Sequence, residues 1–351
     1  MKTQVIIVFF ILTAVGSVAM GGENTNPPAF PETPVAFMGD WVGTWEVGEE
    51  KHPEIAAQVI AQGSDEYQII LVSKLYVRTP PILTITAKVI DGSLGFDDGF
   101  FWGEITGDTF VGGKRDEDSS AFQMKPFTLQ SPSLGAKPPW NAIVLFDGSN
   151  FTQWKRFPRG AFWNILETGI LQANPKLGAI ETNRKFKDCK LHLEFRTPYL
   201  PEARGQNRGN SGVFVQDYYE VQILDSYGLQ GYWNECGAIY RISAPYVNMC
   251  LPPLQWQTYD IEFRAARFDR RGKLKENARM TVIHNGVVVQ KDQKILHGTS
   301  GDAKSPPVSP IKTPEPLHLQ AHGNCVQFRN IWIRDLTNNG VKRKHQLYSK
   351  R

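Results

Sequence analysis

The sequence predicts an all-β protein in which two packed antiparallel sheets follow a smaller antiparallel β domain. Apolar and polar residues alternate over many short segments, such as Tyr259–Arg264, with the two-residue period of strands. The chain holds 31 Gly and 23 Pro, which form turns and interrupt helices. Asn285-Gly286 lies between two apolar runs and is a strong hairpin signal. Many one-sided strands and few helical patterns favour a sandwich.

The N-terminus has the pattern of an export signal, which we place at residues 1–20. Lys2 is followed by the apolar run Val5–Val15, too short to span a bilayer, and by the small-x-small site Ser17-Val18-Ala19. We therefore expect a secreted or periplasmic protein with no transmembrane segment after cleavage. A retained membrane anchor is the alternative. Residues 21–36 are rich in Gly, Asn and Pro and are expected to form a flexible leader.

Residues 37–130 are predicted to form the small β domain, a sheet or partial barrel. Turn signals such as Asp91-Gly92 and Gly107-Asp108 separate its short apolar segments. No catalytic constellation is evident in this domain. Asp97, Asp98 and Glu104 could be functional, but solvated turn and edge charges are the interpretation we favour.

Residues 131–141 are a Pro/Gly linker by composition, and residues 142–336 are predicted to form the sandwich. The end, 337–351, is a basic tail that holds Lys342, Arg343, Lys344, Lys350 and Arg351. The formal net charge is +4, so the rest of the chain is close to neutral. It lacks the basic field that nucleic-acid binding requires, and no nucleic-acid partner is expected.

The four cysteines, Cys189, Cys236, Cys250 and Cys325, contain no C-x-x-C spacing, which argues against a structural zinc site. In an exported protein one or two disulfides are plausible, and Cys236 with Cys250 is the most local pair. Free buried thiols are the equal alternative.

The segment Ser211–Asp225 carries the clearest functional pattern. Its second half alternates, so Glu220 and Gln222 stand about 7 Å apart on one face of a strand while apolar residues occupy the other. Asp225 follows where the strand should end. This arrangement presents acid/base and hydrogen-bonding groups to a polar ligand.

Several ordered motifs over about 142–336 resemble the 3-keto-disaccharide hydrolase domain family. They are V-L-F-D-G-S-N-F-T-Q-W, N-S-G-V-F-V, Y-E-V-Q-I-L-D, E-C-G-A-I-Y and L-H-L-Q-A-H-G-N-C-V-Q-F-R-N-I-W-I-R-D-L. The resemblance implies a concanavalin A-like two-sheet jelly roll. The linker and the G-D-W-V-G-T-W segment resemble, more weakly, a leader module found before this domain.

The resemblance also implies cleavage of glycosides oxidised to a ketone at C3. The ketone acidifies the C2 hydrogen, a base removes it, the aglycone leaves from C1, and water then adds. An oxidised sugar is the implied substrate, and a glycoside 3-oxidoreductase is the implied partner, because this chain has no G-x-G-x-x-G fingerprint.

The candidate residues follow from shared strand faces and from the motifs. Glu220 is the leading base or metal ligand, with Asp225 and His322 as further catalytic candidates. The predicted substrate-binding residues are Asn210, Gln222, Glu194, Gln320, Arg329 and Tyr240. A divalent cation is possible, although no compact metal motif such as H-E-x-x-H is present.

Other readings of the same residues stay open. Polar groups on an outward strand face are often only solvated, and His192, Glu194 and Arg196 could form a cross-strand charge ladder. The whole protein could instead be a lectin-like carbohydrate-binding module or a structural surface module.

Overall fold

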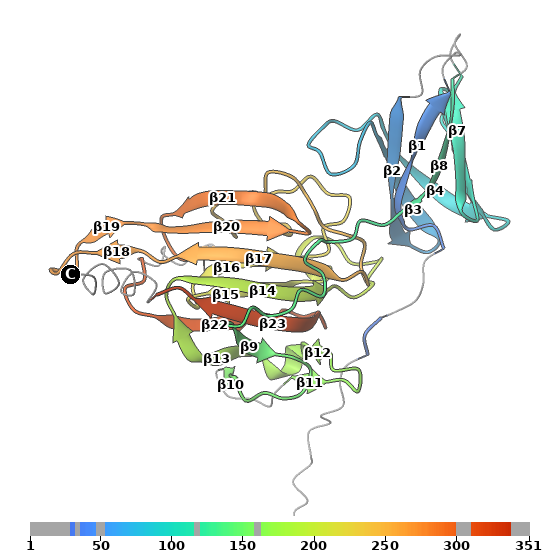
Figure 1. The fold of residues 1–351 in the computed structure, drawn as a ribbon. Helices are drawn as coiled ribbons and strands as arrows, with labels where there is room; N and C mark the ends of the chain where they lie inside the picture. The colour runs from blue at the N-terminus through green and yellow to red at the C-terminus, as the bar shows by residue number, and fades with distance from the viewer. Residues whose placement is uncertain are drawn as a thin grey trace, which may run out of the picture.

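The computed structural model describes residues 29–31, 36–46, 53–115, 120–157, 163–299 and 310–337. The predicted export signal, most of the leader and nearly all of the basic tail lie outside these ranges. The described residues contain strands and two short 3-10 helices, Pro175–Leu177 and Gly205–Asn207, and no α-helix. None of their helices has the length and apolar character to cross a membrane. The all-β prediction is confirmed, and Figure 1 shows a barrel beside a larger sandwich.

The first unit is a closed eight-stranded antiparallel barrel in which each strand pairs with the next and β8 returns to β1. Its strands are β1 (Gly39–Glu46), β2 (Glu54–Gly63), β3 (Glu66–Val72), β4 (Leu83–Ile90), β5 (Ser93–Asp97), β6 (Phe101–Thr106), β7 (Thr109–Lys114) and β8 (Ala121–Phe127). Inside it, Phe110 makes edge-to-face contacts with Trp41 and Phe122. Closure leaves no unpaired sheet edge.

The second unit is a sandwich of a five-stranded and an eight-stranded sheet. The five-stranded sheet has the order β10 (Trp154–Phe157), β13 (Ala179–Phe186), β22 (Glu315–Leu319), β15 (Ser211–Val215) and β16 (Tyr219–Ile223). The eight-stranded sheet has the order β11 (Asn164–Ile165), β12 (Leu171–Gln172), β23 (Gln327–Asp335), β14 (Cys189–Arg196), β17 (Gln257–Arg264), β20 (Ala278–His284) and β21 (Val287–Ile295), with β9 (Ile143–Phe146) beside β23. A small ribbon, β18 (Arg267–Phe268) with β19 (Leu274–Glu276), extends from it.

The core of the sandwich lies between the two sheets and fixes which way each strand faces. Val213, Val221 and Leu319 of the small sheet and Leu193 and Ile261 of the large sheet are fully or almost fully buried in it. Because side chains alternate along a strand, the residues between these apolar positions point outward. The predicted hairpin at Asn285-Gly286 is confirmed: it joins β20 to β21, and both turn residues have positive φ.

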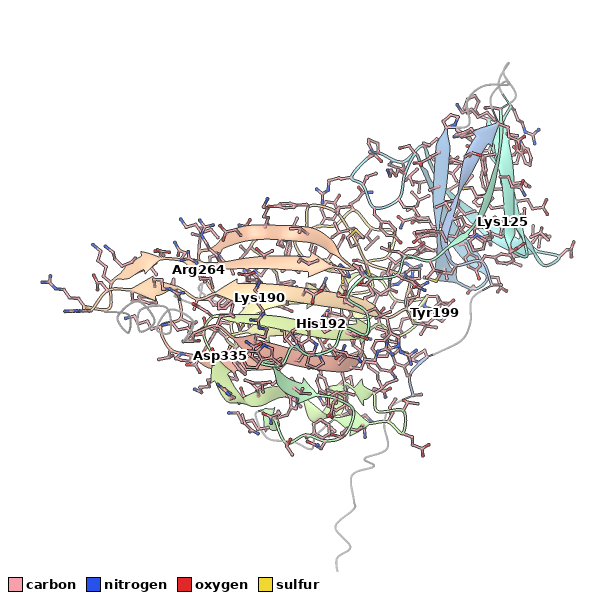
Figure 2. The ribbon with its side chains drawn as sticks, in the orientation of Figure 1. Lys125, Lys190, His192, Tyr199, Arg264 and Asp335 are labelled. Atoms are coloured by element: carbon pink, nitrogen blue, oxygen red, sulfur yellow. The ribbon has the colours of Figure 1, made fainter. Side chains whose placement is uncertain are left out.

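The chain between barrel and sandwich lies over the outer face of the eight-stranded sheet, as Figure 1 shows. Ser133 donates a hydrogen bond to Asp260 of β17 (2.6 Å), and the Gly135 amide donates one to Glu194 of β14 (2.6 Å). Figure 2 shows Lys190 and His192 on this same face of β14. The linker is therefore held against the sheet along part of its length.

Barrel and sandwich also meet directly. The buried Asp40 of β1 accepts hydrogen bonds from Tyr76 of the barrel and from Tyr227 of the sandwich (2.9 Å). Arg78 donates to the carbonyl oxygen of Gly231 (2.7 Å). A Cβ on Gly228 would overlap the side chain of Ile60 of the barrel, so this glycine lets the Ile60 side chain pack directly against the backbone of the sandwich. The four cysteines are described, and all of them are free thiols.

Candidate active site

A row of polar and aromatic side chains crosses the outer face of the five-stranded sheet. Strand register places Glu181 of β13 beside His318 of β22, His318 beside Phe214 of β15, and Phe214 beside Glu220 of β16. In the next row, the Gln320 amide donates to the Gly212 carbonyl, and Gly212 pairs with Gln222. We call Glu220, Gln222, His318 and Gln320 the polar face.

Glu220 is the most perturbed acid of this face. Its side chain is buried, with the residue 5% exposed, and burial raises its pKa from 4.5 to about 8. No hydrogen bond to its carboxyl group comes from the residues that the structure describes. The carboxyl leans over Gly212, where a Cβ would overlap Oε1. The glycine therefore makes room for the acid, and the acid lacks the donors that would stabilise its charge.

The two amides of the polar face also have spare acceptor capacity. The side-chain oxygens of Gln222 and Gln320 are buried and have no hydrogen-bond partner among the described residues. Gln222 Nε2 donates to Gln206 Oε1 (3.0 Å), and Gln206 in turn accepts from Asn210 Nδ2. Buried acceptors without donors are unfavourable unless a ligand or water supplies the donor. A ligand rich in hydroxyl groups would meet this need.

His318 is oriented by its neighbours. Its Nδ1 lies 3.0 Å from Asp217 Oδ1, and its ring stacks on Phe214 with centroids 4.7 Å apart. A carboxylate at Nδ1 favours the tautomer that carries its proton there, so the contact with Asp217 orients the ring. Two strand spacings separate His318 from Glu220, which is about 10 Å between Cα atoms. Phe214 lies between them in the row.

The loop after β16 brings aromatic side chains beside Glu220. The segment around Ile239 pairs with the edge of β16, and the Tyr240 amide donates to the Glu220 carbonyl (3.1 Å). Trp233 packs edge-on against Tyr240, with centroids 5.6 Å apart, and is 49% exposed. Burial and the charge of Glu220 raise the pKa of Tyr240. Sequence reasoning proposed Tyr240 but missed Trp233, because no strand periodicity marks a loop residue.

Five of the predicted residues lie on or beside the polar face: Glu220, Gln222, Gln320, Asn210 and Tyr240. His322 is placed differently from the prediction. β22 ends at Leu319, so His322 lies in the following loop and is exposed. His318 lies on β22, two residues before Gln320 in the same alternation, and it occupies the row beside Phe214. That shared alternation was the signal that could have selected it.

Asp225 takes a structural position rather than a place on the polar face. Its carboxylate is buried and accepts hydrogen bonds from Arg208 Nε (2.7 Å) and from the Tyr227 amide. Burial raises its pKa, and the guanidinium of Arg208 opposes that change. Because Asp225 and Arg208 form an ion pair with each other, the carboxylate of Asp225 stabilises the turn after β16.

Glu194 and Arg329 belong to the other sheet. They pair with each other across β14 and β23 (2.6 Å) under the linker, away from the polar face. Burial opposes ionisation of Glu194, but hydrogen bonds from His192, Asn330, Arg329 and the Gly135 amide lower its pKa to about 2. Of the alternative charge ladder His192, Glu194 and Arg196, Glu194 therefore helps to hold the linker, whereas Arg196 donates to Gln327 of β23 (2.7 Å).

The described residues hold no group of three or more His, Cys, Asp or Glu side chains arranged to bind a metal ion. The candidates on the polar face are one carboxylate, one imidazole and two amides. Binding of a divalent cation therefore remains a prediction from the sequence.

A two-sheet sandwich with buried hydrogen-bond acceptors and aromatic side chains on one outer face has the features of a carbohydrate-active protein. The chain belongs to the 3-keto-alpha-glucoside-1,2-lyase-like domain family, whose model matches residues 141–334. The family resemblance inferred from the motifs is thereby confirmed.

Two solved structures from Parabacteroides distasonis, both provisionally named glycosyl hydrolases, are similar to the chain. One is 39% identical, with a TM-score of 0.53, over 56% of this chain and 85% of that chain. The other is 20% identical, with a TM-score of 0.41, over 56% of this chain and 94% of that chain. Among curated proteins, none matches the chain significantly. The family and the first structure support a glycoside hydrolase-like function.

Proposed function

We propose that the protein is an exported enzyme that cleaves 3-keto-glycosides, including 3-keto-disaccharides, by removing the proton at C2. The observation that carries the proposal is Glu220, a buried carboxyl with a pKa of about 8. An ordinary carboxylate is a weak base toward a carbon acid. A base whose pKa lies near the operating pH combines a useful ionised fraction with greater proton affinity.

The reaction divides into an elimination and a hydration. Glu220 takes the C2 proton, the C1–O bond breaks, and a C1=C2 double bond forms next to the C3 ketone. In this proposal the departing oxygen takes a proton from His318 in its imidazolium form. Water then adds its hydroxyl to C1 and gives its proton to His318, while Glu220 returns its proton to C2. Both residues regain their starting forms, and the net change is hydrolysis. This route differs from that of ordinary glycosidases, which use two carboxylates at a set spacing.

The other residues of the site bind and orient the substrate. The unpartnered oxygens of Gln222 and Gln320 accept hydrogen bonds from sugar hydroxyls. Tyr240 and the exposed Trp233 offer apolar ring faces to the part of the substrate beyond the cleaved bond. Gln206 and Asn210 hold Gln222 in position.

The substrate must be oxidised before this chemistry can occur. We propose that a separate glycoside 3-oxidoreductase supplies the ketone, and that the reaction takes place outside the cytoplasm after removal of residues 1–20. Both proposals rest on the family resemblance and the sequence of the N-terminus.

The test is product release from 3-keto-trehalose and 3-keto-lactose by the purified protein. We expect wild-type protein to release glucose or 3-keto-glucose, and Glu220→Gln to lose at least about 10²-fold in kcat, the scale of one acid/base group. Binding of unoxidised glycan that is unaffected by Glu220→Gln, with no turnover, would instead identify a lectin. Activity that survives EDTA would remove a metal from the reaction.

A further inference from the structure

The outer surface of the barrel carries a hollow, separate from the polar face of the sandwich, over strands β5 and β6 and the residue after β7. Gly95, Phe96, Asp97, Trp102, Glu104 and Arg115 line it. Trp102 faces outward because its strand neighbours Phe101 and Gly103 are buried on the inner side. Register places Asp97 and Gly113 on either side of Trp102.

Glycines shape this surface. The Trp102 indole lies against the backbone of β7, since a Cβ on Gly113 would be 3.1 Å from its Nε1. One flank of the indole is therefore supported by the sheet. Gly95 pairs with Glu104 in the neighbouring row and carries no side chain to fill the space. The result is a half-buried indole at the floor of an open hollow.

Charged groups surround the indole. Arg115 forms an ion pair with Asp97 (2.6 Å), which fixes a guanidinium and a carboxylate at one end of the hollow. Glu104 is exposed and makes no ion pair with the described residues. With Asp91, which also lines the hollow, carboxylates outnumber guanidinium groups three to one. This balance disfavours phosphates, nucleic acids and other anionic polymers.

We propose that this hollow is an accessory binding site for a neutral carbohydrate chain. A pyranose ring packs its C–H face on Trp102, and its hydroxyls bond to the carboxylates of Asp97 and Glu104 and to the guanidinium of Arg115. An aromatic side chain surrounded by hydrogen-bond donors and acceptors suits a ligand that has an apolar ring face and polar edges. Since Tyr227 of the sandwich donates to Asp40 of the barrel, a chain bound in the hollow would be held on the same molecule as the polar face.

The proposal is tested on the full chain by affinity electrophoresis and calorimetry. The probes are unoxidised neutral hexasaccharides with β-1,4-glucosyl, α-1,4-glucosyl, β-1,4-mannosyl and β-1,4-xylosyl backbones. We expect at least one probe to bind, and Trp102→Ala to weaken that binding about tenfold, the loss expected for one stacking contact. Glu104→Ala, an exposed change that should fold normally, is expected to weaken it about threefold.

Two controls separate this site from others. Trp140 is 96% exposed in the linker, so Trp140→Ala removes an exposed indole without touching the hollow. Glu220→Gln disables the polar face. Both variants should bind within twofold of wild type. Absence of binding to all four probes at millimolar concentration, or equal binding by wild type, Trp102→Ala and Glu104→Ala, would overturn the proposal.

Discussion

At the scale of single residues, Glu220 illustrates a conflict between stability and chemistry. A buried carboxyl with no donor is unfavourable once ionised, yet ionisation is what allows it to take a proton. Its folded-state pKa of about 8 lies above the ordinary 4.5. Folding therefore resists ionisation of this group, and the resulting destabilisation grows as pH rises from about 4.5 to about 8. Active sites commonly accept such a loss of stability.

Glu220→Gln should therefore stabilise the protein at alkaline pH while abolishing activity. Glutamine keeps the shape and cannot ionise, so at pH 9 we expect the free energy of unfolding to rise by about 5 kcal/mol, which is the free energy of the pKa shift from 4.5 to about 8. At pH 4.5 the two proteins should be nearly equal. Thermal unfolding of both proteins across this pH range measures the difference. A constant difference at every pH would show that Glu220 is not buried as described.

His318 and His322 form a matched pair for the second residue-scale prediction. His318 lies on the strand, oriented by Asp217, whereas His322 is exposed in the loop beyond it. We expect His318→Ala to lower kcat about 10²-fold and His322→Ala to change it less than threefold. The assay is turnover of the same 3-keto-disaccharides. If His322→Ala lost activity and His318→Ala kept it, the catalytic residue would be His322 and not His318.

At the scale of elements, the site depends on how three strands are placed in one sheet. β15 lies between β22 and β16 and contributes Gly212 and Phe214 to the outer face. Gly212 leaves a gap between Gln320 and Gln222, into which the Glu220 carboxyl leans. The middle strand thus supplies space rather than a reacting group, and the flanking strands supply the chemistry.

Gly212→Ala tests this arrangement. Its Cβ would overlap the end of the Glu220 side chain, which can move, so the fold should survive while the carboxyl is displaced. We expect kcat/KM to fall at least tenfold and the unfolding temperature to change by only a few degrees. Gly95→Ala in the barrel is the control, because its φ is not positive and a Cβ there meets only the Gly103 carbonyl oxygen, at 3.7 Å. Wild-type activity in Gly212→Ala would contradict the inference that the Glu220 carboxyl must lie close over the backbone of residue 212.

At the scale of the whole molecule, a buried hydrogen-bond cluster fastens the barrel to the sandwich. The carboxylate of Asp40 accepts from Tyr227 across the interface and from Tyr76 and Gln58 within the barrel. Burial raises the pKa of Asp40, and these hydrogen bonds oppose that rise. The interface also extends the sandwich core, since Ile60 and Ile70 of the barrel pack into it. The linker, whose Gly135 amide donates to Glu194, adds a second attachment.

Tyr227→Phe should loosen this interface. It removes the hydroxyl that Asp40 accepts from and leaves a buried acceptor less satisfied, which costs about 1–3 kcal/mol. We expect a lower unfolding temperature and faster proteolysis between barrel and sandwich. Tyr232→Phe is the matched control, because Tyr232 is 58% exposed. Equal behaviour of the two variants would show that the hydroxyl of Tyr227 does not hold the units together.

Much of this architecture could be predicted from local patterns. The alternation in Tyr219–Ile223 correctly put Glu220 and Gln222 on one face, and Asn285-Gly286 correctly marked a hairpin. The same alternation, applied to residues 317–322, continued past the true end of β22 and favoured His322. Alternation states which side a residue faces, but it does not state where a strand stops pairing.

The sequence by itself determined the all-β class, the family and the two faces of each strand, because the period of two is a property of neighbouring residues. Only the tertiary structure decided that Glu194 and Arg329 lie on a different sheet from Glu220, that Asp225 pairs with Arg208, and that Trp233 stands beside Tyr240. Those facts depend on which distant strands and loops pack together. Strand pairing and loop packing arise from contacts between residues far apart in the chain. The residue pattern of a single strand does not determine which strand pairs with it.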